Sequence, residues 1–559
     1  MPPRTPNTTS SSTPSAEVRH FKRPAERPFT REDRERVTLL FGGLTLRHEA
    51  LIHAGLESVG YRPQVVPTPE KADFQAGKEY GNNGQCNPTY FTVGALANYL
   101  KKLRDEDGIP TERILDEYVF LTAGACGPCR FGMYEAEYRL ALRNAGFDGF
   151  RVLLFQQKAG LEQSDVESGL TFDVNFFLTL LNAVMIGDLL NEVAYQIRPY
   201  EVEAGATDRA LARCVHVMQK LLRDKNYDEI QGGRVAGFLK HLTPFENEQS
   251  IVSFLDQLRG DHYLEGLREC ARIIDEEVEV DFLRAKPITK VTGEFWAQTT
   301  EGDGNFRMFP FLESQGSEVI VEPVTTWLNY LLHQAIEQRK DHERLAPFDD
   351  ERGVKRWWNR SKARWDGASS RFHLRLAQRI LLREYDRMRE ALGGTTHGQI
   401  DQLELQRVGH PYYNARSQGG EGHLEVAKNI YYMNHDLAHL VLSLKPFGCM
   451  PSTQSDGAQA AVVSHFPNML YLPIETSGEG DVNAHSRVQM ALGEAKVKCR
   501  DEFKRAVEKT GLSLEELRER VEADRELRRP LQTIAERAGF AGKGARFAFH
   551  VAERAGVAQ

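Results

Sequence analysis

Four cysteines stand in turns rich in glycine, where thiols could bind a metal or react. Two of them, Cys126 and Cys129, lie in the run Thr122-Ala-Gly-Ala-Cys-Gly-Pro-Cys-Arg-Phe-Gly-Met-Tyr134, between an apolar run and a helical pattern. Backbone N–H groups at a helix N-terminus carry partial positive charge, so we expect them to favour thiolate over thiol. Glycines there let a bulky anionic group approach the main chain. The turn therefore predicts a metal–sulfur cluster or a reactive dithiol.

Cys86 and Cys449 lie in similar turns, Tyr80-Gly-Asn-Asn-Gly-Gln-Cys-Asn-Pro88 and Phe447-Gly-Cys-Met-Pro-Ser-Thr-Gln-Ser-Asp-Gly457. The other three cysteines, Cys214, Cys270 and Cys499, lie in helical stretches and are interpreted as isolated thiols. Seven cysteines in 559 residues are too few for a disulfide framework, and no signal-peptide apolar segment is found. Both observations predict a cytoplasmic protein.

Three chemistries could use the four glycine-turn cysteines. A thioredoxin-like dithiol matches Cys126-Gly-Pro-Cys129, but Ala125 replaces the usual Trp, and Cys86 and Cys449 would have no role. Structural zinc takes four thiolates, usually as two close pairs, whereas only one pair is close here. An iron–sulfur cluster takes four thiolates, or three with one open iron. The spacing alone favours the cluster only slightly.

Composition narrows the class of protein. The chain is 41% hydrophobic and 27% charged, with a net charge of −8, as in an ordinary soluble globular protein. A negative net charge argues against a nucleic-acid binder. No uninterrupted apolar run reaches the roughly 18–20 residues of a membrane span, so no membrane insertion is predicted.

Strand and helix patterns alternate over residues 37–163, which predicts a first α/β lobe with a parallel sheet. It would hold Cys86, Cys126 and Cys129 on loops at the carboxyl ends of its strands. The strands are predicted at Val37–Gly43, Tyr61–Pro67, Tyr118–Leu121 and Arg151–Phe155, and the helices at Thr45–Val59, Thr89–Leu103 and Met133–Asn144.

A second α/β lobe is predicted over residues 286–324 and 425–500, with Cys449 after one of its strands. Residues 325–424 form a helical insertion in this lobe. Residues 1–36 are predicted as a disordered tail rich in Ser, Thr and Pro. Residues 164–285 are helical, with Phe172–Tyr195 as a buried helix pair, and residues 501–559 form a helical tail that begins near the capping box Ser513–Glu516.

Six blocks of the sequence resemble the iron–sulfur component of the 2-hydroxyacyl-CoA dehydratase and benzoyl-CoA reductase superfamily. The closest match is the C-terminal portion of the long CoA-enzyme activase proteins, and the resemblance covers Val37 to Lys498. The blocks are Gly81-Asn-Asn-Gly-Gln-Cys-Asn-Pro-Thr-Tyr90, Cys126-Gly-Pro-Cys-Arg-Phe-Gly-Met-Tyr-Glu-Ala-Glu-Tyr138, Arg139-Leu-Ala-Leu-Arg-Asn-Ala-Gly-Phe147, Gly293-Glu-Phe-Trp-Ala-Gln-Thr-Thr-Glu-Gly-Asp-Gly-Asn305, Pro446-Phe-Gly-Cys-Met-Pro-Ser-Thr-Gln-Ser-Asp-Gly457 and Glu475-Thr-Ser-Gly-Glu-Gly-Asp-Val-Asn-Ala-His-Ser-Arg487.

The resemblance implies two Rossmann-like lobes that face each other. It also implies a [4Fe-4S] cluster between them, held by Cys86, Cys126, Cys129 and Cys449, and a partner that supplies low-potential electrons, an actin-like ATP-dependent activase. The chain lacks the Gly-rich, Asp-containing phosphate loop of the long form, so the activase is expected to be a separate polypeptide.

Whether the chain is itself an enzyme stays open. Well-studied dehydratase subunits resembling this chain often use three cysteine ligands and leave one iron for an acyl-CoA substrate. A cluster with four cysteine ligands transfers electrons but has no open iron. The resemblance thus implies either a 2-hydroxyacyl-CoA dehydratase-like lyase or a component of an ATP-coupled reductase, as a homo- or heterodimer. The alternative is a metal-stabilised scaffold, with iron–sulfur or zinc, that docks a partner and performs no chemistry.

Several polar residues outside the cysteine turns are further candidates. Glu475, Glu479 and His485 are candidate acid–base groups. The acidic loops Glu301-Gly-Asp303 and Glu475 to Asp481 could supply such groups or could cap helices, and His485 and Arg487 would face the same cleft if a helix begins at Val482.

Three more patterns have a structural and a functional interpretation. Arg130, which follows the cysteine pair, could balance cluster charge. His435 and His439 have the spacing of a metal pair on a helix, but a strand is predicted from Leu437. The basic, Trp-containing stretch 352–365 could grip a CoA phosphate, but an amphipathic helix with a solvated basic face is the better interpretation.

Overall fold

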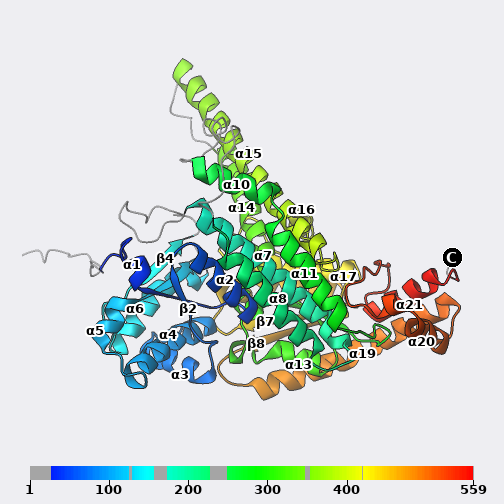
Figure 1. The fold of residues 1–559 in the computed structure, drawn as a ribbon. Coiled ribbons are helices and arrows are strands. Elements are labelled where there is room, and N and C mark those ends of the chain that lie inside the picture. The colour runs from blue at the N-terminus through cyan, green and yellow to red at the C-terminus, as the bar shows by residue number, and fades with distance from the viewer. Residues whose placement is uncertain are drawn as a thin grey trace, which may run out of the picture.

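The computed structural model describes residues 27–124, 129–156, 173–226, 248–345, 353–417 and 419–557. These residues form an α/β protein with two four-stranded parallel sheets and many helices (Figure 1). The predicted α/β class is confirmed at this level.

The first sheet has the strand order β2-β1-β3-β4, and all neighbours are parallel. Its central strands are continuous apolar runs because helices cover both faces; Leu39 and Leu40 are fully buried although they point to opposite faces. The four strands predicted for this lobe are confirmed. They are β1 (Thr38–Phe41), β2 (Arg62–Val65), β3 (Tyr118–Gly124) and β4 (Val152–Gln156).

Five helices accompany the first sheet. They are α2 (Leu46–Ser58), α3 (Lys71–Tyr80), α4 (Asn87–Asp105), α5 (Thr111–Glu117) and α6 (Tyr134–Asn144). The sequence analysis missed α3. It packs against α4 so closely that a Cβ atom at Gly94 would lie 1.8 Å from the carbonyl oxygen of Asp73. Pro88 occupies the first turn of α4, as predicted.

The second sheet repeats the order of the first, as β6-β5-β7-β8, and is also parallel. Its strands lie within the residues predicted for the second α/β lobe. They are β5 (Ile288–Gly293), β6 (Glu318–Ile320), β7 (Leu440–Pro446) and β8 (Tyr471–Thr476). Its helices include α12 (Phe295–Thr299), α13 (Met308–Ser314), α17 (Gly422–Asn434), α18 (Met450–His465) and α19 (Asp481–Thr510).

The helical region between the lobes contains α7 (Val174–Ile197), α8 (Ala206–Arg223), α10 (Glu248–Arg259) and α11 (His262–Glu277). The predicted helix pair is wrong, because α7 is a single helix of 24 residues. One span in the described part of the chain, residues 174–200, is long and apolar enough to cross a membrane. Of its most apolar window 67% is buried, so it packs as the core helix of a soluble protein does.

One hydrophobic core joins the first lobe, the helical region and the C-terminus. It includes Leu39 of β1, Leu190 of α7 and Phe547 of the last helix. The C-terminal residues therefore pack into the body, as α20 (Leu514–Ala523) and α21 (Lys543–Arg554). The capping box predicted at Ser513 and Glu516 is confirmed.

Cys214 and Cys270 are not isolated, contrary to the sequence interpretation. They meet between α8 and α11, each with its sulfur 3.6–3.7 Å from the other's carbonyl oxygen.

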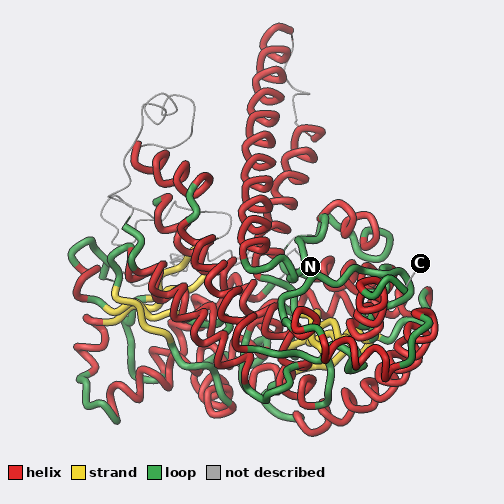
Figure 2. Tube along the Cα trace, turned by 45° about the vertical axis from the view of Figure 1, so that its right-hand side comes forward, coloured by secondary structure: helices red, strands yellow, loops and turns green. Residues whose placement is uncertain are grey.

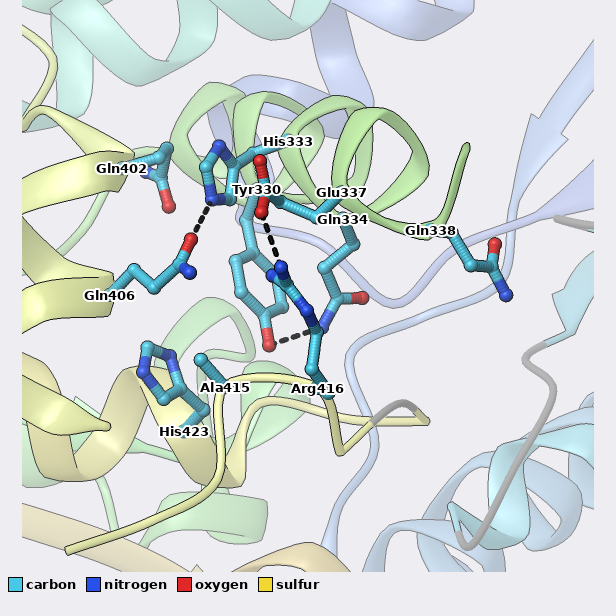
Figure 3. A pocket seen from close by; sticks show the side chains of 10 residues that line it. All are labelled: Tyr330, His333, Gln334, Glu337, Gln338, Gln402, Gln406, Ala415, Arg416 and His423. Carbon is cyan, nitrogen blue, oxygen red and sulfur yellow. Dashed lines mark hydrogen bonds and ion pairs between the residues drawn. The ribbon is translucent and has the colours of Figure 1, made fainter. Parts of the chain in front are cut away.

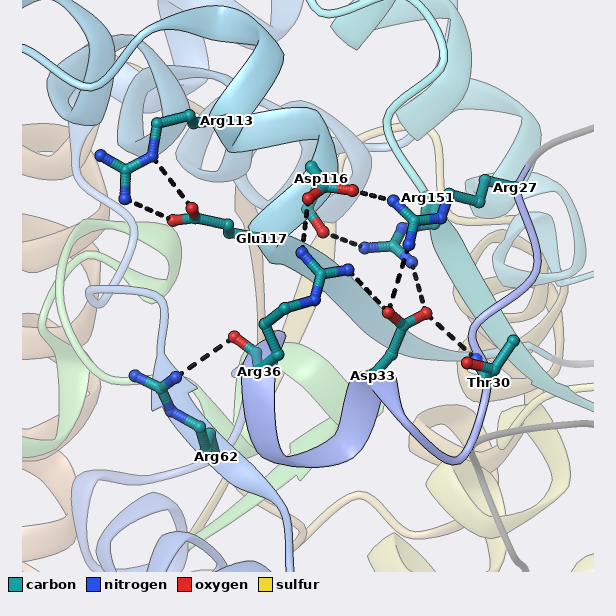
Figure 4. Close-up of polar contacts among 9 residues, drawn as sticks. All are labelled: Arg27, Thr30, Asp33, Arg36, Arg62, Arg113, Asp116, Glu117 and Arg151. Carbon is teal, nitrogen blue, oxygen red and sulfur yellow. Dashed lines mark hydrogen bonds and ion pairs between the residues drawn. The ribbon is translucent and has the colours of Figure 1, made fainter.

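Residues 27–36 pack against the first lobe, so the disordered tail predicted to end at Arg36 is too long by at least this segment. Phe29 is buried in the core. Asp33, in the short helix α1 (Asp33–Arg36), has four donors to its carboxylate, of which Arg27 at 3.5 Å is the most distant (Figure 4). Its carboxylate accepts from the N–H of Thr30 at 3.1 Å, from Arg36 at 2.7 Å and from the buried Arg151 at 3.3 Å. Although burial opposes it, these donors hold the pKa of Asp33 below its usual range. The rest of the predicted tail, residues 1–26, lies outside the described residues.

Two long helices of the insertion form an arm that projects from the body (Figures 1 and 2). They are α14 (Val324–Leu345) and α15 (Gly353–Ala391), followed by the short helix α16 (Gln402–Gly409). The buried Asp188 of α7 anchors the base of the arm, since its carboxylate accepts from the first N–H groups of α14, those of Val324 at 2.7 Å and Thr325 at 2.8 Å.

Candidate metal centre

Three of the four predicted cysteines lie where helices begin. Cys86 is the N-cap residue of α4 and Cys449 that of α18. Cys129 follows β3 and precedes a short 3₁₀ turn, Arg130–Met133. The fourth, Cys126, lies outside the described residues. The structure thus shows why the three turns are rich in glycine, since each changes direction sharply between a loop or strand and a helix.

Backbone contacts bring the Cys86 and Cys449 turns together across the two lobes. The N–H of Asn87 donates to the carbonyl oxygen of Phe447 at 2.9 Å. A Cβ atom at Gly448 would lie only 3.2 Å from the Cα of Cys86, and the φ of +76° at this position also requires glycine. The close approach of the two turns therefore depends on Gly448.

The Cys129 turn reaches the same place. A Cβ atom at Gly420, just before α17, would lie 3.7 Å from the Cβ of Cys129 and 2.4 Å from the ring of Pro451. Arg130 donates to the carbonyl oxygen of Gly84, which ties this turn to the loop that carries Cys86. Three segments from two lobes thus meet at one point.

The two sheets place their cysteines at equivalent positions. Cys129 follows β3 and Cys449 follows β7, and each of these strands lies beside the first strand of its sheet. In a parallel sheet with this order, the chain leaves the two neighbouring central strands, β1 and β3 or β5 and β7, in opposite directions. A crevice opens between the carboxyl ends of these two strands. The thiols occupy the crevices of both sheets.

Burial raises the pKa of Cys86, Cys129 and Cys449 and so keeps these thiols protonated, which corrects the expectation that helix N-termini make them thiolates. Cys86 and Cys449 are each 6% exposed. Loss of water raises the pKa of Cys86, Cys129 and Cys449, and the carboxylate of Glu294 adds to the rise in all three. The hydroxyl groups of Thr89 and Tyr134, 3.1 Å and 3.0 Å from the sulfur of Cys86, only partly offset it.

Three glutamates face these thiols, Glu421 and Glu425 buried and Glu294 partly buried, and the sequence analysis did not single them out. Glu294 follows β5, and its side chain accepts from the N–H of Ala297 at 2.9 Å. Glu421 caps α17 and accepts from the N–H of Phe295 at 2.7 Å. Glu425, one turn further, accepts from the hydroxyl group of Ser452 at 2.7 Å. Two features of the sequence could have identified site residues among them: Glu294 directly follows a strand, and Glu421 lies between glycines.

Burial raises the pKa of Glu421 to about 8 and that of Glu294 to about 7. The charges of Glu294 and Glu425 raise the pKa of Glu421 further. In the metal-free protein the thiols of the site are therefore neutral, and Glu294 and Glu421 are protonated to a large extent, because burial disfavours charged groups. A metal or cluster that binds here would displace the thiol protons.

Replacing Glu421 with glutamine tests this charge balance. In the folded state Glu421 keeps its proton up to about pH 8, whereas in the unfolded state it releases the proton near pH 4.5. Glu421 therefore lowers the free energy of unfolding of the protein as pH rises between these values. Glutamine keeps the acceptor for the Phe295 N–H but never ionises. We expect E421Q to melt at a higher temperature than the wild type at pH 8 and at the same temperature at pH 4.5, with both proteins metal-free. Equal melting temperatures at both pH values would show that Glu421 carries no such penalty.

A small cavity lies on the other side of α17, between α14 and α16 (Figure 3). Its volume of about 10 Å³ has room for roughly one water. His423, whose ring nitrogens have no hydrogen-bond partner among the described residues, lines it together with Tyr330. Burial lowers the pKa of His423 to about 4, so the ring is neutral. The histidine behind the glutamates therefore adds no charge to the site.

The acid–base candidates from the sequence lie near the site but point elsewhere. Glu475 lies near the end of β8, Glu479 follows this strand, and both are exposed. His485 stacks on Phe311 with ring centroids 3.9 Å apart and bonds the carbonyl oxygen of Phe306 at 2.8 Å. Their catalytic role stays a prediction.

The remaining candidates have structural partners. Asp303 accepts from the N–H of Lys71 at 3.0 Å, and Arg487 donates to the carbonyl oxygen of Pro473 at 2.9 Å. Glu301 is half-buried. His435 ends α17 and His439 precedes β7, so the two do not share a helix, as expected.

Within the described ranges, no three His, Cys, Asp or Glu side chains are close enough together to hold a single metal ion. The thiols of a cluster bind different irons and need not meet that condition. No protein-family model matches the chain, and a comparison with curated proteins finds no relative either.

Proposed function

We propose that this chain is an iron–sulfur protein that accepts low-potential electrons from an ATP-dependent activase and passes them to a substrate or partner. The observation that supports it most is the meeting of the buried Cys86 and Cys449 with the half-buried Cys129, from two separate lobes. The lobes would then be Rossmann-like, each with its ligands at the crevice of its sheet.

The donor set has the chemistry that a [4Fe-4S] cluster requires. Thiolates are its usual ligands, and none of the three described cysteines is in a disulfide. Cys126 would be the fourth ligand, since it belongs to the same turn as Cys129. When bound, such a cluster supplies one-electron transfer at low potential.

The protein around the thiols suits an electron carrier. Cys86 and Cys449 are buried, and loss of water around a cluster that already carries net negative charge disfavours its reduced, more negative state. A low reduction potential follows. Such a carrier is reduced only by a strong donor, which is the reason to expect an ATP-driven activase as its partner.

A reduction experiment tests the electron-acceptor role. The reconstituted chain is mixed anaerobically with a purified actin-like activase, ATP and a chemical reductant, and reduction of the chain is followed by its visible absorption. We expect reduction that requires both the activase and ATP, and no reduction when ATP is replaced by a non-hydrolysable analogue. Full reduction by the chemical reductant alone would contradict the proposed low potential and the need for an activase.

The structure also supports a role for the site in holding the lobes together. Beside the cysteines, Phe74 and Phe91 of the first lobe pack with Trp296 of the second, with 5.6 Å between the ring centroids of Phe91 and Trp296. This contact fixes the distance between the two crevices. A group bound by thiols from both lobes would therefore find its ligands already positioned.

A further inference from the structure

The outer face of the arm carries large apolar side chains that the fold does not use. On α15, Trp365 is 78% exposed, Phe372 63% and Leu376 44%. A helix turns by about 100° per residue, so these three side chains lie within about 40° of one line along the helix. Leu381, Tyr385 and Met388 of the same helix are buried and lie on the opposite side. The exposed line thus points away from the body of the protein.

The same helix is strongly basic. Residues 353–383 hold nine basic residues and one acidic residue, in a chain whose net charge is −8. Arg375 and Arg379 are exposed and lie along one side of the apolar line. A shallow hollow of about 410 Å³, lined by Ser369, Ser370 and His373, opens beside Trp365. The outer face of α15 therefore presents exposed apolar side chains, a shallow pocket next to them, and a basic edge formed by Arg375 and Arg379.

We infer that the outer face of α15 binds an acidic amphipathic helix of another protein. Trp365 and Phe372 are seven residues apart, the repeat at which side chains of one helix enter the grooves of another. The apolar line is only one side chain wide, whereas a membrane-surface helix needs a broad apolar face. Two arms of two copies would repel each other because both are basic. An acidic amphipathic helix can pack its apolar seam on the narrow apolar line and pair its carboxylates with the arginines beside that line.

This inference does not depend on the proposed cluster. Near the base of the arm, Gln378 of α15 donates to Asn329 of α14 at 2.7 Å, and Arg387 of α15 donates to the carbonyl oxygen of Leu258 of α10 at 3.1 Å. The exposed side chains contribute little to the core, so replacing them leaves the fold intact. Binding to the arm can therefore be measured with protein that holds no metal.

The test uses the full chain and labelled synthetic peptides, with binding followed by fluorescence anisotropy. One peptide is a four-heptad helix with leucine and alanine along its seam and glutamate at the flanking positions; the other has lysine in place of glutamate. We expect the acidic peptide to bind and the lysine peptide not to. The variant W365A/F372A should bind the acidic peptide at least about tenfold more weakly. R375E/R379E should bind it more weakly and gain affinity for the lysine peptide.

The matched control is V482A/M490A, which removes two apolar side chains that are 78% and 76% exposed on α19. It should bind as the wild type does. The inference is overturned if the acidic peptide does not bind, or if W365A/F372A binds it as well as the wild type. Three further results would overturn the inference if the acidic peptide does not bind. They are that W365A/F372A abolishes self-association in sedimentation equilibrium, binding to equimolar phosphatidylcholine–phosphatidylglycerol vesicles, or binding to an oligothymidylate.

Discussion

Alanine in place of Cys86, Cys129 or Cys449 is expected to remove most of the iron from anaerobically reconstituted protein. The three thiols come from different segments, so each loss leaves one corner of the proposed cluster without a ligand. The wild type should hold about four irons per chain, and each variant only a small fraction of that. Cys126→Ala should behave in the same way, because the sequence places it in the same turn. Iron and acid-labile sulfide are measured by colorimetric assay.

Cys499→Ala is the matched control for these variants. Cys499 is as buried as the proposed ligands, at 3% exposure, but lies on α19 beside Glu502, away from the cysteine turns. Cys214→Ala and Cys270→Ala are further controls in the helical core. All three should keep their iron. Full iron retention in a Cys129→Ala, Cys449→Ala double variant would rule out a shared cluster.

Glu322→Gln is expected to destabilise the protein by about 3–5 kcal/mol at neutral pH, the cost of leaving a buried charge without its partner. Glu322 receives the buried Lys290 of β5 at 2.5 Å and Lys428 of α17 at 3.5 Å. Burial would raise the pKa of Glu322, but the two lysines lower it to about 2. The change removes the only carboxylate that these two lysines contact among the described ion pairs. Urea unfolding measures it.

The pH dependence distinguishes this mechanism from a simple packing defect. Burial lowers the pKa of Lys290 to about 8. Above that pH the lysine is neutral in the folded wild type and needs no partner, so the penalty of E322Q should shrink between pH 7 and about pH 9. Lys290→Met removes the charge itself and should cost less than E322Q, because Glu322 keeps Lys428. A penalty that does not change with pH would mean that the buried lysine is not its cause.

The sheets could be predicted because their signal is local. Each strand is a short apolar run bounded by Gly, Pro or polar residues, and a parallel strand covered on both faces shows no alternation. Cys129 and Cys449 could be placed for the same reason, since a thiol after a buried strand must lie at a carboxyl edge. The same prediction is wrong for Cys86, which follows the unpredicted helix α3 and not a strand. The helix α3 was missed because Lys71–Tyr80 is polar; it is fixed by its contact with α4 through Gly77 and Gly94.

The glutamates of the site could not be predicted, because their role depends on contacts between distant segments. Glu421 follows the long arm in the sequence, yet it bonds Phe295 and lies beside Cys129 and Cys449. The pKa of the thiols was mispredicted for a related reason. The helix dipole is a local effect that the sequence shows, whereas burial, which outweighs it here, results from the meeting of two lobes.

The most direct test of the central claim is the metal content and electron paramagnetic resonance spectrum of the wild-type chain purified without oxygen. We predict a brown protein with about four irons and four acid-labile sulfides per chain. After reduction by a donor of much lower potential than the reductant of the activase experiment, we predict the resonance of a reduced [4Fe-4S] cluster. Cys499→Ala, measured alongside, should give the same spectrum. A colourless protein with one zinc per chain and no resonance in either redox state would contradict the account and assign the thiols to a structural zinc site.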